Sequence, residues 1–535
     1  MASPFKERQY QTEARNSIFE YFASGATGNP VVAMPTGTGK SIVIAEFLRT
    51  TLARWPDQRV IMLTHVKELI EQNAEKLLRI WPEAPLGIFS AGLKTKQNKL
   101  PIVFGGIQSV SKAIKKYGDD YFGRRNLILI DECHLLSPKD DTMYQYTVKA
   151  LTAINPSLRI IGFTATPYRL KQGMIIENGL FTDICFDLTS TEAFNRLIAS
   201  GYIAPLIPKQ TNVKIDTSNV AIVGGDYNGK QLQVAVDKDD IIEAAVKEMV
   251  TFGKDRKSWL VFAAGIKNAD HIANVLMRYG INSVSSHSKL SDDENARHIS
   301  EFKNGNVRAL VNNNKFTTGF DHPGIDMIGM LRPTMSPGLW VQMLGRGTRP
   351  FPNKDNCLVL DFAQNTKRLG PINDPVKPNP KLKGPAGEAP VKICEECGVY
   401  NHASARICFF CGSEFTFRTK IFEYASTDDL IRGDRPVVEY FEVTNVLYQK
   451  HEKTGKPPSM KVSYLCGLQM FSEWVCFEHG GYAKKNAHDW WRQRSNLAIP
   501  ETTDEALSEA SGLRKPDKIR VWVNKAYPEI LSVEW

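Results

Sequence analysis

The sequence has no apolar run that approaches the roughly 20 residues of a membrane span. Its first residues, 1–8, lack the apolar core of a secretory signal peptide. No sequence repeat is visible along the chain. These absences argue against a membrane-spanning, secreted or repeat protein, and they predict an intracellular, cytoplasmic one.

A strong excess of one charge sign is also missing. The chain carries 67 Lys and Arg against 58 Asp and Glu, which gives a formal net charge of +9. That modest excess favours a polyanionic partner without establishing one. With 535 residues, 42% hydrophobic and 23% charged, the chain reads as an ordinary globular protein of about three or four domains.

The most informative segment is the run AMPTGTGKS at residues 33–41. It follows a short apolar strand at 30–33 and opens a helical stretch at 42–48, which is the context of a phosphate-binding loop. Ala33 stands where the general pattern has its first glycine, so an ordinary turn is the alternative. The predicted nucleotide contacts are Thr36, Gly37, Thr38, Gly39, Lys40 and Ser41.

A second apolar strand, at 126–130, ends in two acidic residues. Ligands of open α/β sheets bind at the carboxyl ends of such strands. Asp131 is therefore predicted to hold Mg²⁺ together with Ser41, and Glu132 to orient and deprotonate the attacking water. The alternative is a pair of acids that caps the next helix.

The second half contains apolar strands at 259–263 and 309–312 and the pattern Gln-x-x-Gly-Arg-x-x-Arg at 342–349. Arg346 and Arg349 are three residues apart, and we expect them on one face of a helix. Two guanidinium groups so placed can cross a cleft and stabilise the transferring phosphoryl group. Two arginines on a solvated helix face are the alternative.

These motifs occur in one order: the phosphate loop, Asp-Glu-Cys-His at 131–134, Thr-Ala-Thr at 164–166 and the arginine motif. That order resembles superfamily 2 helicases over roughly residues 5–365, with further matches at 8–11, 63–69 and 106–109. In detail the chain resembles the RadD-like and XPB/SSL2-type DEAD/DEAH-box branch. The resemblance implies an α/β fold of two tandem RecA-like parallel-sheet domains.

The resemblance also implies further site residues. Gln11 would read the adenine edge, Gly319, Asp321 and Gln342 would contact nucleotide, and His134, Thr164 and Thr166 would couple hydrolysis to domain movement. The residues expected at nucleic-acid phosphates are Gln108, Ser109, Thr317 and Thr318. The polar run at 312–315 departs from the family pattern and puts contacts of that loop in doubt.

Composition divides the rest of the chain. A stretch rich in Pro, Gly and Lys reads as an extended linker. The predicted divisions are a first, ATP-binding RecA-like domain at 1–205, a second at 206–368, the linker at 369–392, a zinc ribbon at 393–416 and a C-terminal accessory domain at 417–535.

Four of the nine cysteines form two Cys-x-x-Cys pairs, each followed by a glycine. They are Cys394, Cys397, Cys408 and Cys411. This spacing predicts a closed Cys₄ zinc site, and disulfides are the alternative. The absence of a secretory signal favours zinc, because the cytosol keeps thiols reduced.

The C-terminal region is expected to form a small β-rich domain. Alternating stretches at 437–446 and 460–468 predict strands, and residues 483–494 predict a helix. Its Lys, Arg and Trp residues could bind single-stranded DNA by stacking and phosphate contact, or the tryptophans could be core residues.

The sequence therefore predicts an ATP-dependent DNA helicase or translocase, and the resemblance implies a role in DNA repair or recombination in a bacterial or phage setting. ATP, Mg²⁺ and Zn²⁺ are the expected cofactors, and DNA, single-stranded or branched, is the expected partner, with repair proteins and without a membrane. The alternatives are a restriction or phage-defence motor, an RNA helicase and a non-enzymatic nucleic-acid-binding scaffold.

Overall fold

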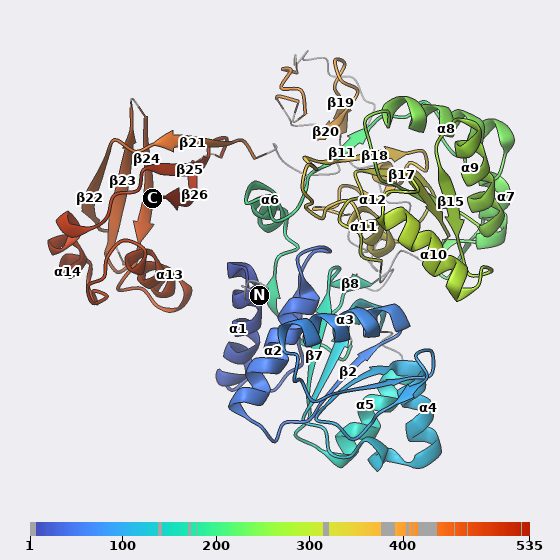
Figure 1. The fold of residues 1–535 in the computed structure, drawn as a ribbon. Coiled ribbons are helices and arrows are strands. Elements are labelled where there is room, and N and C mark those ends of the chain that lie inside the picture. The colour runs from blue at the N-terminus through green and yellow to red at the C-terminus, as the bar shows by residue number, and fades with distance from the viewer. Residues whose placement is uncertain are drawn as a thin grey trace. The chain divides into compact units, whose positions relative to one another are not determined.

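The computed structural model describes residues 7–136, 142–169, 173–177, 179–313, 320–375, 391–402, 406–408, 410–415, 436–453, 455–467, 469–525 and 527–535. The chain divides into two compact units, residues 1–194 with 201–433 and residues 195–200 with 434–535. No helix in the described part of the chain has both the length and the apolar character needed to cross a bilayer. Each unit has its own core of buried apolar side chains. Figure 1 shows the helices and strands of both units.

The first sheet of unit 1 contains eight strands in the order β10-β1-β7-β6-β2-β5-β3-β4. All neighbouring strands are parallel except β3 and β4. The bounds are β1 (Pro30–Ala33), β2 (Val60–Thr64), β3 (Leu86–Ser90), β4 (Thr95–Lys96), β5 (Ile102–Gly106), β6 (Leu127–Asp131), β7 (Arg159–Thr164) and β10 (Asp183–Asp187). Its central strands are buried from end to end, which is why they read as continuous apolar runs.

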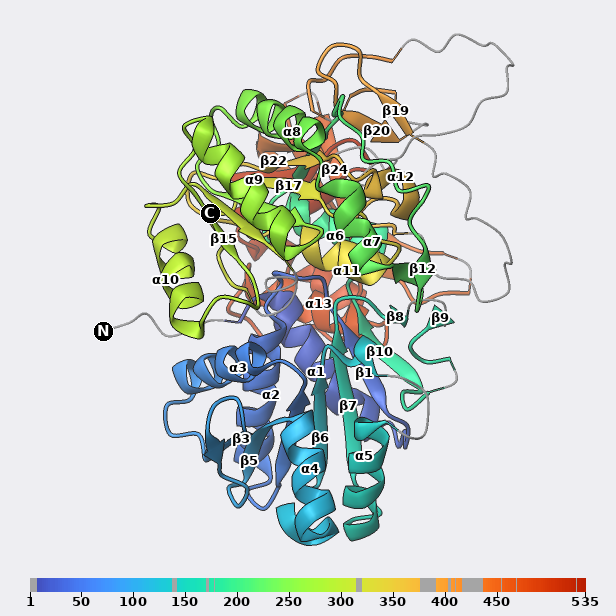
Figure 2. The ribbon, with the colours of Figure 1, turned by 90° about the vertical axis from the view of Figure 1, so that its right-hand side faces the viewer.

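Helices cover both faces of this sheet, with α1, α2 and α3 on one side and α4 and α5 on the other (Figure 2). Their bounds are α1 (Gln9–Ala23), α2 (Lys40–Arg54), α3 (Lys67–Ile80), α4 (Ile107–Tyr117) and α5 (Met143–Ile154). A short hairpin of β8 (Tyr168–Arg169) and β9 (Gly173–Met174) follows β7, and α6 (Thr191–Ala199) follows β10.

The second sheet has six parallel strands in the order β11-β18-β17-β14-β16-β15. They are β11 (Leu206–Lys209), β14 (Trp259–Ala263), β15 (Ser283–Ser286), β16 (Ala309–Asn312), β17 (Met327–Leu331) and β18 (Cys357–Asp361). The associated helices are α7 (Gly229–Val236), α8 (Asp239–Phe252), α9 (Ile266–Arg278), α10 (Asp292–Lys303), α11 (Pro337–Leu344) and α12 (Asn365–Leu369), with a hairpin of β12 (Ile222–Val223) and β13 (Asp226–Tyr227). The prediction of two tandem RecA-like domains is confirmed.

A cysteine module follows the second sheet. Its hairpin pairs β19 (Val391–Ile393) with β20 (Tyr400–His402), and an antiparallel bridge joins Val399 to Lys209 at the end of β11. Most of the predicted linker, residues 376–390, lies outside the described residues.

Unit 2 is the predicted small β-rich domain. Its two antiparallel sheets each contain three strands, in the orders β21-β25-β26 and β22-β23-β24. The bounds are β21 (Val438–Glu442), β22 (Asn445–His451), β23 (Ser459–Cys466), β24 (Gln469–Val475), α13 (Gly481–Arg492), α14 (Thr503–Ser508), β25 (Lys518–Trp522) and β26 (Glu529–Glu534). The strands predicted at 437–446 are present as β21 and the start of β22, which belong to different sheets.

Candidate active site

The phosphate-binding loop connects β1 to α2 and depends on two glycines in the left-handed region. Gly37 has φ +85° and Gly39 has φ +88°. A Cβ atom on Gly39 would lie 2.5 Å from Nε2 of Gln11, so an added side chain would displace the Gln11 amide and would strain the backbone at this positive φ. These turns direct the start of α2 toward the end of the sheet, where Lys40 and Ser41 lie at the helix N-terminus.

The two acids at the end of β6 are held by different partners. Asp131 accepts hydrogen bonds from Asn73 Nδ2 at 2.9 Å and from the backbone N–H of Glu132 at 3.0 Å. Glu132 adopts φ +51°, and its Oε1 lies 3.1 Å from Lys40 Nζ. Its Oε2 lies 3.4 Å from His134 Nδ1 and accepts no hydrogen bond from the described residues. Sequence reasoning missed Asn73, because nothing in the sequence of α3 marks an amide that fixes a carboxylate on another strand.

Burial and neighbouring charges separate the pKa values of these two acids. Burial and the adjacent Glu132 raise the pKa of Asp131. Burial also acts to raise the pKa of Glu132, but the charge of Lys40 and the hydrogen bond that Lys40 donates outweigh it and lower that pKa. Glu132 is therefore an ionised carboxylate at neutral pH, with one oxygen free to accept a proton.

His134 links the acid motif to two other predicted residues. Its Nδ1 lies 2.9 Å from Thr164 Oγ1, and the same oxygen accepts from the backbone N–H of Thr166 at 3.0 Å. Its Nε2 lies 3.2 Å from Nε2 of Gln342 in the second motor domain. Burial lowers the pKa of His134 to about 4, so the ring is neutral. The network then assigns the ring proton to Nδ1 and makes Nε2 the acceptor for the Gln342 amide.

Both arginines follow α11 instead of lying on it. The expectation that they share a helical face is wrong, because α11 ends at Leu344 and the turn that begins at Gly345 carries Arg346 and Arg349. Arg346 Nη1 donates to the carbonyl of Phe320 at 2.7 Å, and Arg349 Nη1 lies 2.8 Å from Asp321 Oδ1. Burial and the charge of Arg349 lower the pKa of Arg346 to about 9, which leaves it cationic at neutral pH.

Gly345 explains how closely the turn approaches the phosphate loop. A Cβ atom on this glycine would lie 1.6 Å from Thr36 Oγ1. No side chain fits there without separating the two surfaces. The glycine of the arginine motif is thus a packing requirement, which the sequence pattern alone did not reveal.

The phosphate loop, the acids and the arginines line one cavity of about 300 Å³. The predicted residues in its wall are Thr36, Gly37, Gly39, Lys40, Ser41, Asp131, Glu132, Asp321, Arg346 and Arg349. Arg8, Gln72 and Lys76 also line it and were not predicted. A basic residue is a weak signal in a helix such as α3, so sequence reasoning had no means to select Lys76.

Other predicted residues lie beside this cavity or away from it. Gln11 Nε2 donates to the carbonyl of Thr38 at 2.9 Å, and Gln342 contacts His134. Gln108 and Ser109 lie at the start of α4, where Ser109 Oγ accepts from the N–H of Ala91 at 2.9 Å. Thr317, Thr318 and Gly319 lie outside the described residues.

The four predicted metal-ligating cysteines converge. Their sulfur atoms lie within 4.8 Å of one another. The Sγ atoms of Cys394 and Cys411 are 3.6 Å apart, and those of Cys397 and Cys408 are also 3.6 Å apart. Four thiolates placed tetrahedrally at about 2.3 Å from a zinc ion would be about 3.8 Å apart, whereas a disulfide needs about 2.05 Å. The arrangement fits a tetrahedral metal site.

Comparison with known proteins agrees with this geometry. A family model described as "Type III restriction enzyme, res subunit" matches residues 4–169, and "Helicase conserved C-terminal domain" matches residues 240–350. The chain carries a superfamily 2 helicase core. This class of core hydrolyses ATP.

Two relatives show the extent of the likeness to this helicase core. The "Putative ATP-dependent helicase IRC3" of Saccharomyces cerevisiae is 26% identical over 379 residues, 69% of this chain, which spans about half (53%) of that protein. The "51.5 kDa protein" of a Lactococcus phage is 25% identical over 396 residues, 73% of this chain and 79% of that one.

Among solved structures, a fragment of "a putative HsdR subunit of a type I restriction enzyme from Vibrio vulnificus YJ016" is 21% identical. The match covers 74% of this chain and 71% of that one, with a TM-score of 0.51. At this level of identity the match supports the fold of the helicase core. The RadD-like and XPB/SSL2-type assignment stays a prediction.

Proposed function

We propose that this chain is an ATP-dependent DNA translocase or helicase that acts in DNA repair or recombination. One observation carries the enzymatic part of the proposal. Lys40, Asp131 and Glu132 of the first motor domain share a cavity with Arg346 and Arg349 of the second. A site assembled from both domains links each hydrolysis event to their relative movement, which is the requirement for a motor.

Each residue of the cavity has a separate task in hydrolysis. Lys40 holds the β and γ phosphates beside the loop N–H groups, and Glu132 accepts the proton of the attacking water through its free oxygen. Ser41 and Asp131, a hydroxyl and a carboxylate that line the same cavity, would hold Mg²⁺, which offsets phosphate charge when bound. Arg346 and Arg349 stabilise the charge that develops on the γ-phosphoryl group.

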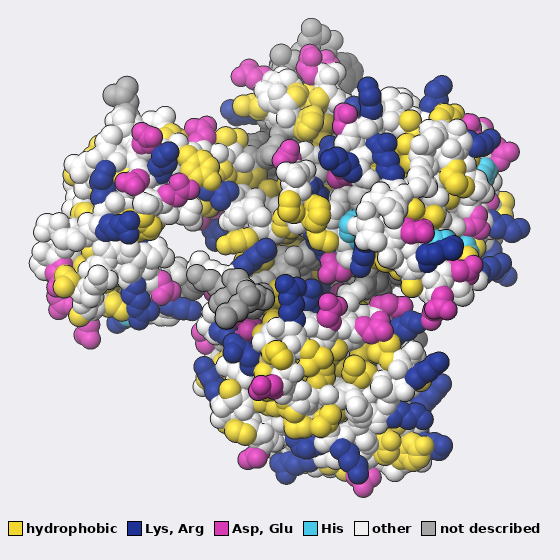
Figure 3. All heavy atoms as spheres, viewed as in Figure 1, with side chains coloured by type: hydrophobic (Ala, Val, Ile, Leu, Met, Phe, Trp, Pro, Cys, Tyr) yellow, Lys and Arg dark blue, Asp and Glu magenta, His cyan; other side chains and the backbone are white. Residues whose placement is uncertain are grey.

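Nucleic acid is the proposed partner of the motor. On the face drawn in Figure 3, Lys and Arg side chains are scattered among acidic ones instead of forming one continuous patch. The proposed contacts are local ones, at Gln108 and Ser109 and at Thr317 and Thr318, of which the last two lie outside the described residues. Backbone contacts of this kind do not distinguish bases, so RNA remains an alternative substrate.

The C-terminal unit has exposed aromatic side chains that could contact a single strand, and Trp474 is one of them. Trp490 and Trp491 are core residues, with exposed fractions of 9% and 0%, so the stacking role predicted for the tryptophans does not apply to them. Trp474 on β24 is 51% exposed and pairs in register with Lys461 on β23. A flat ring beside an ammonium group suits base stacking with phosphate contact.

The cysteine module is proposed to hold one structural Zn²⁺ through Cys394, Cys397, Cys408 and Cys411. The convergence of four sulfur atoms supports this assignment. Such a module has too small an apolar core to fold without its metal.

The deciding experiment measures the ATPase rate of the full chain with single-stranded DNA, duplex DNA, forked DNA and RNA. We expect a low basal rate and strong stimulation by DNA that weakens as salt rises, because backbone contacts displace condensed counterions. A rate that is indifferent to every nucleic acid at low salt would refute the motor proposal.

A restriction or phage-defence motor is the second candidate, favoured by the match to a restriction-enzyme subunit over residues 4–169. It predicts ATP-dependent cleavage of plasmid DNA once a nuclease partner is supplied. A repair motor instead acts on forks or single strands without cleaving plasmid.

A further inference from the structure

The chain reverses direction directly after Arg349. A tight turn follows, in which Asn353 has φ +62° and an antiparallel bridge joins Phe351 to Lys354. The backbone N–H of Lys354 also donates to the carbonyl of Phe351 at 3.1 Å. This reversal brings the Lys354 side chain back to residues 345–349, the arginine turn.

The ammonium group of Lys354 donates three hydrogen bonds to backbone carbonyl oxygens. The acceptors are the carbonyls of Pro323 at 3.0 Å, Gly347 at 2.9 Å and Arg349 at 2.8 Å. An ammonium group has three protons, so these bonds use every donor that it has. Burial lowers the pKa of Lys354, and the three carbonyl oxygens compensate by taking the place of water around the charge. The side chain therefore ties the arginine turn to the segment around Pro323.

The two arginines join the same parts of the chain from the other direction. Arg346 Nη1 donates to the carbonyl of Phe320 at 2.7 Å, and Arg349 Nη1 donates to the same oxygen at 3.0 Å. Arg349 also pairs with Asp321. Because Lys354 binds the carbonyl of Arg349, it fixes the backbone from which that guanidinium group extends.

Lys354 itself stands behind the nucleotide site. Asp321, Pro323, Arg346 and Arg349 line the ATP cavity, whereas Lys354 is not part of the wall that the described residues form. An effect of its ammonium group on nucleotide is therefore transmitted by the groups that it holds.

We propose that Lys354 is a positioning residue, which holds Arg349 where its guanidinium group stabilises the transferring phosphoryl group. The inference rests on the proposed function, because it assumes that Arg349 takes part in hydrolysis. A catalytic group displaced by about 1 Å can lose about 10²-fold in rate, so a fixed backbone at Arg349 has a catalytic consequence. A direct electrostatic effect of the ammonium group on the phosphates is the alternative, and the experiment separates the two.

The test uses the full chain and two substitutions of Lys354. Lys354→Met removes the ammonium group and keeps an unbranched side chain of similar length. Lys354→Gln keeps an amide that can still donate to part of the carbonyl set, and it decides the question if Lys354→Met unfolds at a clearly lower temperature.

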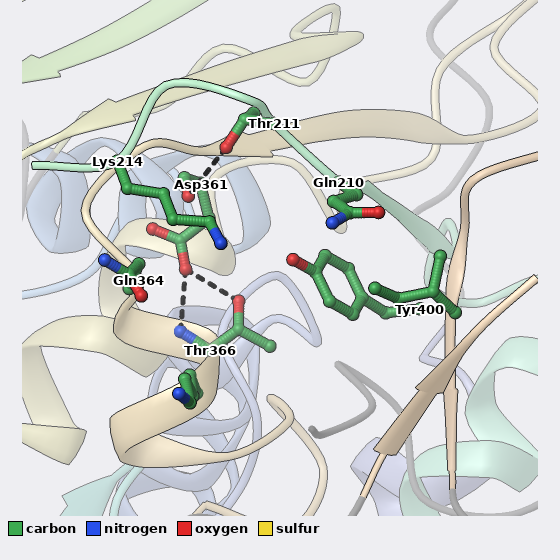
Figure 4. Close-up of a pocket in the computed structure, with 9 residues that line it drawn as sticks. Gln210, Thr211, Lys214, Asp361, Gln364, Thr366 and Tyr400 are labelled. Atoms are coloured by element: carbon green, nitrogen blue, oxygen red, sulfur yellow. Dashed lines mark hydrogen bonds between the residues drawn. The ribbon is translucent and has the colours of Figure 1, made fainter. Parts of the chain in front are cut away.

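Lys214→Met is the matched control for loss of one lysine from the same motor domain. Lys214 is exposed, and its ammonium group donates no hydrogen bond within the described part of the chain. It lines a separate cavity of about 130 Å³ together with Asp361 and Tyr400 (Figure 4). No described residue lines both this cavity and the ATP cavity.

Fluorescence titration measures the affinity for Mg²⁺ and ADP, alone and with aluminium fluoride, which takes the place of the transferring phosphoryl group. Each titration is made with and without single-stranded DNA. We expect Lys354→Met to weaken binding of the aluminium fluoride complex by about tenfold or more, and binding of ADP alone by less than about threefold. The kcat for ATP should fall with the affinity for the complex, while KM changes by less than about threefold. Lys354→Gln should show a smaller loss, and Lys214→Met should match the wild type.

A double-mutant cycle with Arg349→Ala identifies the route of the effect. If Lys354 acts by holding Arg349, adding Lys354→Met to Arg349→Ala should weaken binding of the aluminium fluoride complex by less than about twofold. A direct action of the ammonium charge, or a general loss of stability, would instead persist in the double variant and overturn the inference.

The inference is also overturned if both Lys354 variants bind the aluminium fluoride complex as tightly as the wild type. That result with an intact DNA-stimulated ATPase would leave the motor proposal standing. If no nucleic acid stimulates hydrolysis but the loss in Lys354→Met depends on Arg349, the motor proposal fails and the positioning role of Lys354 holds.

Discussion

Nε2 of Gln342 in the second motor domain lies 3.2 Å from Nε2 of His134 in the first. His134 is in turn bonded to Thr164 at the end of β7 and lies beside Glu132. One amide of the second domain therefore reaches the residue that borders the proposed general base. This contact provides a route by which domain closure is sensed at the hydrolytic site.

Removing the Gln342 amide should uncouple ATP hydrolysis from the closure of the two motor domains. We expect Gln342→Ala to lower the DNA-stimulated ATPase rate by about tenfold, because His134 loses the donor that orients its ring. ATP affinity should change by less than about threefold, because Gln342 does not line the ATP cavity. Steady-state kinetics and nucleotide titration measure the two effects. A large loss of ATP affinity would instead support the predicted nucleotide contact of Gln342.

Substitutions of Lys40 and Glu132 should affect ATP binding and ATP hydrolysis separately. Lys40→Ala should weaken ATP binding, because the ammonium contacts phosphates already in the ground state. Glu132→Gln should retain ATP and lose turnover by about 10²-fold or more, because an amide cannot accept the proton of water. Hydrolysis at the wild-type rate in Glu132→Gln would show that another group is the base.

Arg349 should stabilise the transition state of ATP hydrolysis more than it stabilises bound ATP. Arg349→Ala is expected to abolish the stimulated rate and to leave ATP binding largely intact, since the guanidinium acts as charge develops on the γ-phosphate. Lys247→Ala, on the exposed surface of α8, is the control for loss of one positive charge. Equal losses of ATP affinity and rate would place Arg349 in ground-state binding.

Acid should destabilise the first motor domain through His134. Its pKa is about 4 in the folded chain and about 6.5 unfolded, so the unfolded state binds the extra proton first. The contribution of the neutral His134 ring to the free energy of unfolding is complete above pH 6.5 and falls as the pH drops toward 4. His134→Gln should flatten the decline of the melting temperature over this range, whereas His451→Gln, at an exposed position, should not. Equal slopes in all three proteins would contradict the buried, neutral state of His134.

Zinc should be present at about one equivalent per chain. Metal analysis of protein never exposed to chelator measures it, and Cys394→Ser with Cys397→Ser should remove it. The ATPase fold should survive, because the motor domains have their own cores. Less than a tenth of an equivalent in the wild type would exclude the zinc site.

The sequence by itself determined the features that are set by short stretches of the chain. The apolar runs of β1 and β6 specified buried parallel strands, the glycines of residues 37 and 39 specified a turn with positive φ, and two Cys-x-x-Cys pairs specified a four-sulfur cluster. Each depends on a single short stretch of sequence, the longest being the cysteine pairs within residues 394–411. The placement of Lys40 and the acids at one end of the sheet followed from the same rule of parallel strands.

Only the tertiary structure decided which distant residues meet. The sequence placed both arginines on a helix, but the chain ends α11 at Leu344 and turns at Gly345, which packs against Thr36. His134 and Gln342 are 208 positions apart. No periodic pattern records such a contact, because it depends on how two separate cores present their surfaces. The convergence of three carbonyl oxygens on Lys354 is likewise a property of packing, since the carbonyl of Pro323 is 31 positions away in the sequence.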